Sequence, residues 1–236
     1  MNLPELQNDE ALRQREFPVC AGKVYLAHAG VSPVPACVTR AVQETAAAAA
    51  LDDQEKGLGD LLHSTRARAA EMLGADIGEV ALIGPTTAGL SAVAAGLDWQ
   101  TGDEVLIYQD DFPVNVYPWL ALETRGVTVR RLQTPVLGHI TPELVLEQLT
   151  DKTRLVALAS CHFVSGWRID HDAIGRELRA RDILFCLDAI QTLGAFPTTV
   201  EHVDFLAADA HKWLLGPCAA GVFYVRRDLQ DRLKSE

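Results

Sequence analysis

Asp209-Ala210-His211-Lys212-Trp213-Leu214-Leu215-Gly216-Pro217 follows the apolar run 203–208 and places a lysine, Lys212, just past the end of a predicted strand. An earlier apolar run, 183–187, ends in the same way, with Asp188-Ala189-Ile190-Gln191. Apolar runs without polar alternation are typical of strands that are covered on both faces, as in parallel sheets. Ligands of such sheets bind beyond the carboxyl ends of the strands, so the acid and the lysine are expected to share one site.

The rest of the chain alternates between apolar runs and helical patterns, which predicts an α/β fold. Apolar runs fall at Val80–Ile83, Glu104–Tyr108, 127–132, 155–159, 183–187, Phe205–Ala208 and Gly221–Val225. Helical patterns fall at about 36–51, 60–74, 87–97, 113–125, 141–150 and 170–181, and Gly74 is placed to end the second of them. We expect three layers, α/β/α, around a mostly parallel sheet of about seven strands. Residues 1–25 are predicted to form a polar N-terminal arm, and residues 26–236 one large domain.

The composition narrows the class of protein and of partner. With 236 residues, 48% of them hydrophobic, the chain is long enough to bury a large core. A formal net charge of −11 without a basic block argues against a nucleic-acid partner. No stretch is apolar for long enough to cross a bilayer, and the polar, acidic N-terminus does not resemble a secretory signal, so no membrane partner is expected. The five cysteines include no Cys-x-x-Cys spacing, which favours a reduced, cytoplasmic protein, and no metal site is expected.

Lys212 and Asp188 together suit one cofactor, pyridoxal 5'-phosphate (PLP). PLP needs an amine that holds its aldehyde as a Schiff base and a carboxylate that keeps its pyridine nitrogen protonated. Lys212 would supply the amine, and burial would lower its pKa so that it attacks in the neutral form. Asp188 would supply the carboxylate, although an aspartate after a strand is also a common helix N-cap. Gln191 could donate to the ring oxygen, and His211 could bind near the phosphate or have only a structural role.

Three further loops follow predicted strands and offer polar or aromatic groups. In Gly84-Pro85-Thr86-Thr87-Ala88-Gly89-Leu90, the first amides of a helix and two hydroxyls could bind a phosphate, and an ordinary threonine N-cap is the alternative. In Asp110-Asp111-Phe112-Pro113-Val114-Asn115, Phe112 could stack on a flat ring or lie in the core. In the third loop, 160–168, His162 is more simply a satisfied loop residue, and Arg168 a partner for Asp170 or Asp172.

Together these residues resemble the class V aminotransferases, a PLP-dependent family of fold type I that includes cysteine desulfurases, selenocysteine lyases, kynureninases and isopenicillin-epimerase-like enzymes. The resemblance runs from about residue 25 to residue 225, and the two motifs around Asp188 and Lys212 are its most specific part. It implies an internal aldimine on Lys212, with Asp188 at the pyridine nitrogen and Gln191 at the ring oxygen. It also implies roles for further residues, around the phosphate (Thr86, Thr87, Ala88 and His211), against the ring (Phe112, where desulfurases carry a histidine) and near the substrate (His28, Ala29 and Gly30).

The chain departs from the family at several points. Phe163 stands where desulfurases hold an asparagine toward the ring oxygen. Asp209 stands where a serine often meets the phosphate, and an acid there would repel a phosphate unless it points away. The small C-terminal domain of the family is expected to be absent, together with its substrate-binding arginine and the nucleophilic cysteine that desulfurases carry there. Family members are homodimers with shared active sites, so the resemblance implies a homodimer.

The sequence therefore predicts a PLP-dependent enzyme that acts on a small amino-acid substrate through Lys212, as an aminotransferase or as a lyase of the cysteine desulfurase type. The alternative is a truncated, non-catalytic remnant that binds PLP or a partner. A Rossmann-type nucleotide-binding protein is disfavoured because no Gly-x-Gly-x-x-Gly turn follows the first strand.

Overall fold

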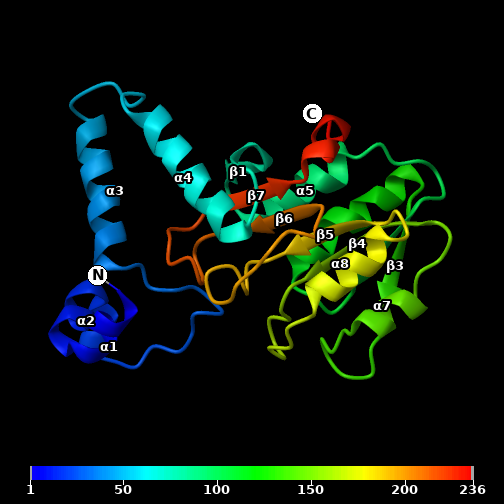
Figure 1. The fold of residues 1–236 in the computed structure, drawn as a ribbon, viewed down its shortest axis with the longest axis horizontal. Helices are drawn as coiled ribbons and strands as arrows, with labels where there is room; N and C mark the ends of the chain where they lie inside the picture. Colours follow the sequence, from blue (N-terminus) through cyan, green and yellow to red (C-terminus); the bar gives the residue numbers. More distant parts are fainter. Residues whose placement is uncertain (1, 235–236) are drawn as a thin grey trace.

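A computed structural model describes residues 2–234 of the chain, and a seven-stranded sheet forms its centre (Figure 1). The strands are β1 (Val80–Ile83), β2 (Glu104–Tyr108), β3 (Thr128–Leu132), β4 (Thr153–Ala159), β5 (Leu184–Asp188), β6 (Phe205–Ala208) and β7 (Gly221–Val225). Their order in the sheet is β1-β7-β6-β5-β4-β2-β3. Strands β2 to β6 run parallel, whereas β7 is antiparallel to both β6 and β1. The predicted mostly parallel sheet is confirmed, and the observed strands lie close to the predicted runs.

From residue 36 onward the helices follow the predicted segments with one exception, and the first two helices lie in the segment predicted as a polar arm. They are α1 (Leu3–Asn8), α2 (Glu10–Glu16), α3 (Ala36–Ala49), α4 (Leu58–Leu73), α5 (Thr86–Gly96), α6 (Tyr117–Leu120), α7 (Pro142–Glu147) and α8 (His171–Arg179), with short 3-10 helices η1 (Pro18–Ala21), η2 (Ile77–Glu79), η3 (Pro113–Asn115), η4 (Ala121–Arg125) and η5 (Arg227–Arg232). The single helix predicted at 113–125 is wrong, because η3, α6 and η4 divide that segment. Pro118 explains the break, since proline lacks the N–H that would continue a helix from the preceding turn.

Two hydrophobic clusters cover the two faces of the sheet. Along β4, Val156 and Leu158 belong to one cluster and Leu155 and Ala157 to the other, because successive side chains of a strand point to opposite faces. Helices α4, α7 and α8 contribute residues to the first cluster, and α5 and α6 to the second. The predicted three-layer α/β/α architecture is therefore confirmed.

Close packing brings the N-terminus of α5 to the carboxyl end of the sheet. A Cβ built on Gly89 would lie 2.7 Å from the Cβ of Ala207 in β6, so glycine permits this approach of helix and strand. Helix α5 starts at Thr86, shortly after β1, and Thr86 Oγ1 accepts a hydrogen bond of 2.9 Å from the backbone N–H of Asp209, just after β6. The start of α5 and the segment that leads to Lys212 are thus tied together.

Helices α3 and α4 form a hairpin that projects from the body of the sheet (Figure 1). Helix α3 has no buried residue. Helix α4 ends at Gly74 in the left-handed conformation (φ 66°), and the N–H of Ala75 donates to Ala70 O at 2.9 Å, so the predicted glycine C-cap is confirmed. The predicted boundary between arm and domain after residue 25 stays a prediction.

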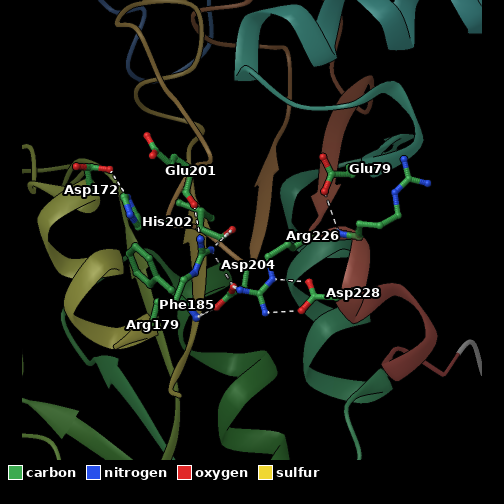
Figure 2. A network of polar contacts seen from close by, with 11 residues as sticks. Glu79, Asp172, Arg179, Phe185, Glu201, His202, Asp204, Arg226 and Asp228 are labelled. Atoms are coloured by element: carbon green, nitrogen blue, oxygen red, sulfur yellow. Dashed lines mark hydrogen bonds and ion pairs between the residues drawn. The ribbon is translucent and has the colours of Figure 1, made fainter. Parts of the chain in front are cut away.

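A network of ion pairs lies at the opposite edge of the sheet from the carboxyl ends of β5 and β6 (Figure 2). Asp204, which immediately precedes β6, is its buried centre and contacts Arg179 and Arg226. The N–H of Phe185 in β5 donates to Asp204 Oδ2 at 2.8 Å. The polar groups at this edge of the sheet therefore bind one another.

The structure bears on two expectations from composition, which concern the cysteines and membrane-spanning helices. All five cysteines are free thiols, and Cys186 is buried within β5. Within residues 2–234, none of the helices combines the length and the apolar character that a membrane span requires. The cytoplasmic location stays a prediction.

Candidate active site

A cavity of about 600 Å³ opens at the carboxyl ends of the parallel strands. The loops after β1, β2, β4, β5 and β6 form most of its wall, and the loop before α3 adds one side. The predicted site residues in its lining are Ala29, Gly30, Thr86, Thr87, Phe112, Asp188, Gln191, His211 and Lys212. His28 and Ala88 lie outside the lining as the described residues define it. One cavity thus brings together most of the residues that the sequence singles out.

Lys212 is held inside this cavity on the loop that follows β6. It is 8% exposed, and its Nζ lies 5.7 Å from the centroid of the Phe112 ring. Burial lowers the pKa of the Lys212 amine, while the charges of Asp188 and Asp209 act in the opposite sense. Within residues 2–234 the amine makes neither a hydrogen bond nor an ion pair, so its lone pair can serve as a nucleophile once the amine is neutral.

Asp188 is the last residue of β5, and its side chain is 2% exposed. Its Oδ1 accepts the N–H of Ile190 at 2.9 Å, and its Oδ2 accepts Asn115 Nδ2 at 2.8 Å. No helix begins directly after Asp188, because residues 189–192 form a turn, so the alternative role of helix N-cap is wrong. Burial raises the pKa of Asp188 to about 7 and the charge of Asp111 adds to the rise, against the two hydrogen bonds and Lys212. A cationic group of a ligand would stabilise this carboxylate.

The sequence interpretation assigned no role to two polar residues of the β2 loop. Asp111 is 8% exposed, lines the cavity, and accepts the N–H groups of Phe112 at 2.7 Å and Ala159 at 3.2 Å. Burial raises its pKa to about 6, against those two hydrogen bonds. Asn115 is 1% exposed and donates to Asp188. The available signal was their position beside Phe112 at the end of a strand.

The first turn of α5 and His211 form the polar end of the cavity. Pro85 is the N-cap of α5 and no side chain caps the helix, so the alternative of an ordinary threonine cap is wrong. The amides of Thr86 and Thr87 belong to the first turn and have no intrahelical acceptors. His211 Nδ1 is buried and lies 2.8 Å from Asp209 Oδ2, with a geometry that does not meet the criteria for a hydrogen bond.

Asp209 does not present a free carboxylate to the polar end of the cavity. It is 4% exposed, and its Oδ1 accepts the N–H groups of Ala210 at 2.7 Å and Ala220 at 3.3 Å. Its Oδ2 accepts the N–H of Ala219 at 3.1 Å. Three backbone donors thus offset the negative charge that would otherwise repel a phosphate.

Phe112 and Phe163 form an aromatic wall of the cavity. Their rings meet edge to face, with centroids 5.3 Å apart and an interplanar angle of 80°. Phe112 is 44% exposed, so the alternative position in the core is wrong. Cys161 lines the cavity nearby, and burial raises the pKa of its thiol. The wall therefore offers an accessible ring face to a flat ligand.

Gln191 joins the N-terminal loop to the Lys212 segment. Its Nε2 donates to Ala29 O at 3.0 Å, and its Oε1 accepts Trp213 Nε1 at 3.1 Å. His28 does not line the cavity but packs against Trp213, with ring centroids 5.6 Å apart, and lies 2.8 Å from Ser32 Oγ. One N–H of the Gln191 amide remains for a ligand.

In the loop after β4, the polar side chains of His162 and Arg168 contact other residues of the protein. His162 is 4% exposed, donates from Nε2 to Asp110 O at 3.0 Å, and accepts the N–H of Ser165 at Nδ1. It is a satisfied loop residue, as expected. Arg168 lies over the ring of Phe196 at 4.5 Å, and the expected ion pair with Asp170 or Asp172 is wrong.

Asp172, Glu201 and His202 bring three ligand-type atoms within 4.8 Å of one another, away from this cavity (Figure 2). Asp172 already contacts His202 Nδ1 at 2.7 Å and Arg176 at 2.5 Å. These contacts account for the cluster without an ion.

Known proteins resemble this chain both in sequence and in fold. The sequence model of the family "Aminotransferase class-V" matches residues 24–235. A probable cysteine desulfurase of Methanothermobacter thermautotrophicus is 29% identical over 229 residues, which cover 94% of this chain and 57% of that relative. The cystine lyase C-DES, solved with glycine covalently linked to its PLP cofactor, superposes with a TM-score of 0.87 at 23% identity, over 94% of this chain and 62% of that one. The apo cysteine desulfurase of Thermococcus onnurineus superposes with a TM-score of 0.87 at 22% identity, over 99% of this chain and 60% of that one.

These likenesses concern the fold and the family of the chain. The chain spans between half and two thirds of the length of these relatives. The two solved structures share its fold, and the family match covers most of its residues. The chain belongs to the class V aminotransferase family.

Proposed function

We propose that this chain binds PLP and forms the cofactor-binding part of an enzyme that transforms amino acids, with Lys212 as the residue that holds the cofactor covalently. The observation that carries this proposal is a single cavity lined by the Lys212 amine, the buried Asp188 carboxylate and the Phe112 ring. Membership of a PLP-dependent family supports it.

The residues of the cavity fit this cofactor on three counts. Asp188 is buried and receives only neutral donors besides the more distant Lys212 charge, so it suits a protonated ring nitrogen. His211 and the uncapped start of α5 lie together in the cavity lining. Both would serve a phosphate. The ring of Phe112 would lie against the pyridine.

Lys212, Asp188 and Gln191 would each have a separate role in the reaction. When bound, PLP withdraws electrons from the α-carbon of an attached amino acid. Lys212 would carry a proton to or from that carbon as general base and acid. Asp188 would accept a hydrogen bond from the ring nitrogen and keep its proton in place. Gln191 would donate its remaining N–H to the ring oxygen.

The reaction class that we infer is an aminotransferase or a lyase of the cysteine desulfurase type, with a small amino acid as substrate. The relatives named as cysteine desulfurases support this choice. A non-catalytic, cofactor-binding role is the competing hypothesis. Steady-state turnover of cysteine, alanine or kynurenine by this chain would exclude that competing role.

We infer further that two copies of the chain associate. Helix α3 buries no residue, although Val42 and Leu51 in and beside it are 53% and 88% exposed. Val24 and Leu26, on the loop that leads toward the cavity, are each 86% exposed. Apolar surface of this kind favours a protein interface. Light scattering after size exclusion should give the mass of a dimer, and a monomer at all concentrations would contradict this inference.

The test of cofactor attachment uses the absorption of the purified chain mixed with PLP. The wild type should become yellow, and borohydride should fix the cofactor on the peptide that contains Lys212. Lys212→Ala should lose this labelling. Lys152→Ala, which removes an exposed lysine far from the cavity, should keep it. Equal trapping of cofactor by Lys212→Ala and wild type would show that the assignment is wrong.

A further inference from the structure

Asn115 is a buried amide side chain that contacts the candidate site through Asp188. It ends the 3-10 turn η3, three residues after Phe112, and it is 1% exposed. Its Nδ2 donates to Asp188 Oδ2 at 2.8 Å, across 73 residues of sequence. Its Oδ1 is buried and has no hydrogen-bond partner among the described residues.

This environment is unfavourable for an amide unless the one hydrogen bond that it makes is needed. A buried acceptor without a partner destabilises a fold, whereas an apolar side chain of similar shape avoids that loss. The next residue, Val116, and nearby Trp119 belong to a hydrophobic cluster, so an apolar residue would suit the packing. The hydrogen bond to Asp188 is therefore the contact that explains an asparagine at this position.

That contact determines how Asp188 faces the cavity. Each carboxylate oxygen receives one neutral donor, Ile190 N–H on Oδ1 and Asn115 Nδ2 on Oδ2. Two donors at fixed positions set the rotation of the carboxylate and leave one lone pair on each oxygen for a ligand. Both donors are uncharged, so neither neutralises the carboxylate as an arginine would.

We propose that Asn115 is a positioning residue, which holds the Asp188 carboxylate in the orientation in which it meets the ring nitrogen of the cofactor. This inference rests on the proposed PLP function. It extends that function to a residue whose side chain is separated from the cofactor by Asp188. The two hydrogen bonds also oppose the burial that raises the pKa of Asp188, which favours the ionised form.

The experiment compares wild type with Asn115→Leu, using PLP labelled with ¹⁵N in the ring. Leucine keeps the branched shape of asparagine, although it is larger, and removes the donor. We expect PLP to bind roughly 10-fold to 100-fold more weakly, since one hydrogen bond to a charged acceptor is lost. At one fixed pH, the ¹⁵N resonance of the ring should shift toward that of neutral pyridine, because Asp188 then competes better for the shared proton. Asn115→Ser is the second variant, should the leucine variant not fold, and it should move both quantities in the same direction.

Gln109→Leu is the matched control, because Gln109 is an exposed amide on the same loop and its hydrogen-bond partner, Arg131, lies outside the cavity lining. It should leave affinity and resonance unchanged. Wild-type affinity and resonance in both Asn115 variants would overturn the positioning role while the PLP function stands. A weaker affinity with an unchanged resonance would also overturn it, because loss of packing alone predicts that result. A wild-type chain that binds no PLP would instead refute the proposed function.

Discussion

Asp188 and Asp204 are two buried aspartates on neighbouring strands, and they lie in opposite electrostatic surroundings. Asp204, 3% exposed, has Arg179 and Arg226 at 3.4 and 2.9 Å from its Oδ1 (Figure 2). Asp188, 2% exposed, has no cation within ion-pair distance in the described chain. Burial raises the pKa of both carboxyls, and that of Asp188 reaches about 7.

The difference separates a structural acid from a site acid. The charge of Asp204 is balanced by arginines of α8 and of the segment after β7, so it fastens the layers together. The charge of Asp188 is balanced only in part, by neutral donors and the more distant Lys212. A buried carboxylate without an adjacent cation, in a cavity, is a candidate binding site for a cationic ligand group. The position of the cation, rather than the burial, tells the two aspartates apart.

The largest effect is expected from removing the structural acid. Asp204→Ala should lower the free energy of unfolding by about 3 kcal/mol or more, because two arginines and the Phe185 N–H lose their buried acceptor. Chemical denaturation measures this. Asp228→Ala is the control, since Asp228 pairs with the same Arg226 but its side chain is 66% exposed, and it should change stability by less than about 1 kcal/mol. Equal losses of unfolding free energy in the two variants would show that Asp204 is no more important for stability than an exposed acid.

Asp188→Asn should have a large effect on the ligand rather than on the fold. The loss of one partner of a buried charge pair predicts PLP binding weaker by about 2–5 kcal/mol. The cofactor-free protein should be as stable as wild type at neutral pH or slightly more stable, because no cation of the fold is left unpaired. Titration of cofactor fluorescence and thermal unfolding check the two parts. Asp110→Asn, an exposed neighbour of the cavity, should change neither. A large loss of stability in Asp188→Asn would show that Asp188 is a structural acid like Asp204.

The pH dependence of stability should include a contribution from the two site acids, Asp188 and Asp111. The pKa of Asp188 rises from 3.8 to about 7 on folding, and that of Asp111 from 3.8 to about 6. Between these limits the folded state binds more protons, so the unfolding free energy of the cofactor-free protein falls as pH rises, by up to about 1.4 kcal/mol per pH unit for each group. Lys212 lines the same cavity, and its charge lowers the pKa of Asp188.

Denaturation of the cofactor-free chain between pH 4 and 7 measures this slope. Asp188→Asn should flatten it relative to wild type, and bound PLP should flatten it as well, because a ring cation lowers the pKa of Asp188. Identical slopes for wild type and Asp188→Asn would contradict the prediction.

Much of the fold could be predicted from the sequence because its signal is local. The strands Val80–Ile83 and Phe205–Ala208 are continuous apolar runs, and their bounds match those predicted. The helix predicted at 113–125 is wrong because Pro118 interrupts the segment, although its apolar pattern is helical. Lys212 and Asp188 stood out because each follows an apolar run whose end must lie at one edge of a parallel sheet.

The rest of the site depends on contacts between distant segments, which no local pattern carries. Asn115 acquires its role from Asp188, 73 residues away. The carboxylate of Asp209 is turned aside by the N–H groups of Ala219 and Ala220, on a loop whose path only the structure shows. Ala219 takes up the left-handed conformation there (φ 63°), which few non-glycine residues adopt and which the sequence does not signal.

The smallest effect is expected at Phe112, which tests whether charge or ring contact dominates the site. Phe112 is 44% exposed and meets Phe163 edge to face, so Phe112→Ala should change the stability of the cofactor-free protein little. Loss of one aromatic contact predicts PLP binding weaker by about 0.5–1.5 kcal/mol, which is less than for Asp188→Asn. Phe112→His keeps a ring and should recover much of this loss. A titration in which Phe112→Ala binds PLP more weakly than Asp188→Asn would show that stacking outweighs the charge pair, and the contrast between Asp188 and Asp204 would then not explain cofactor affinity.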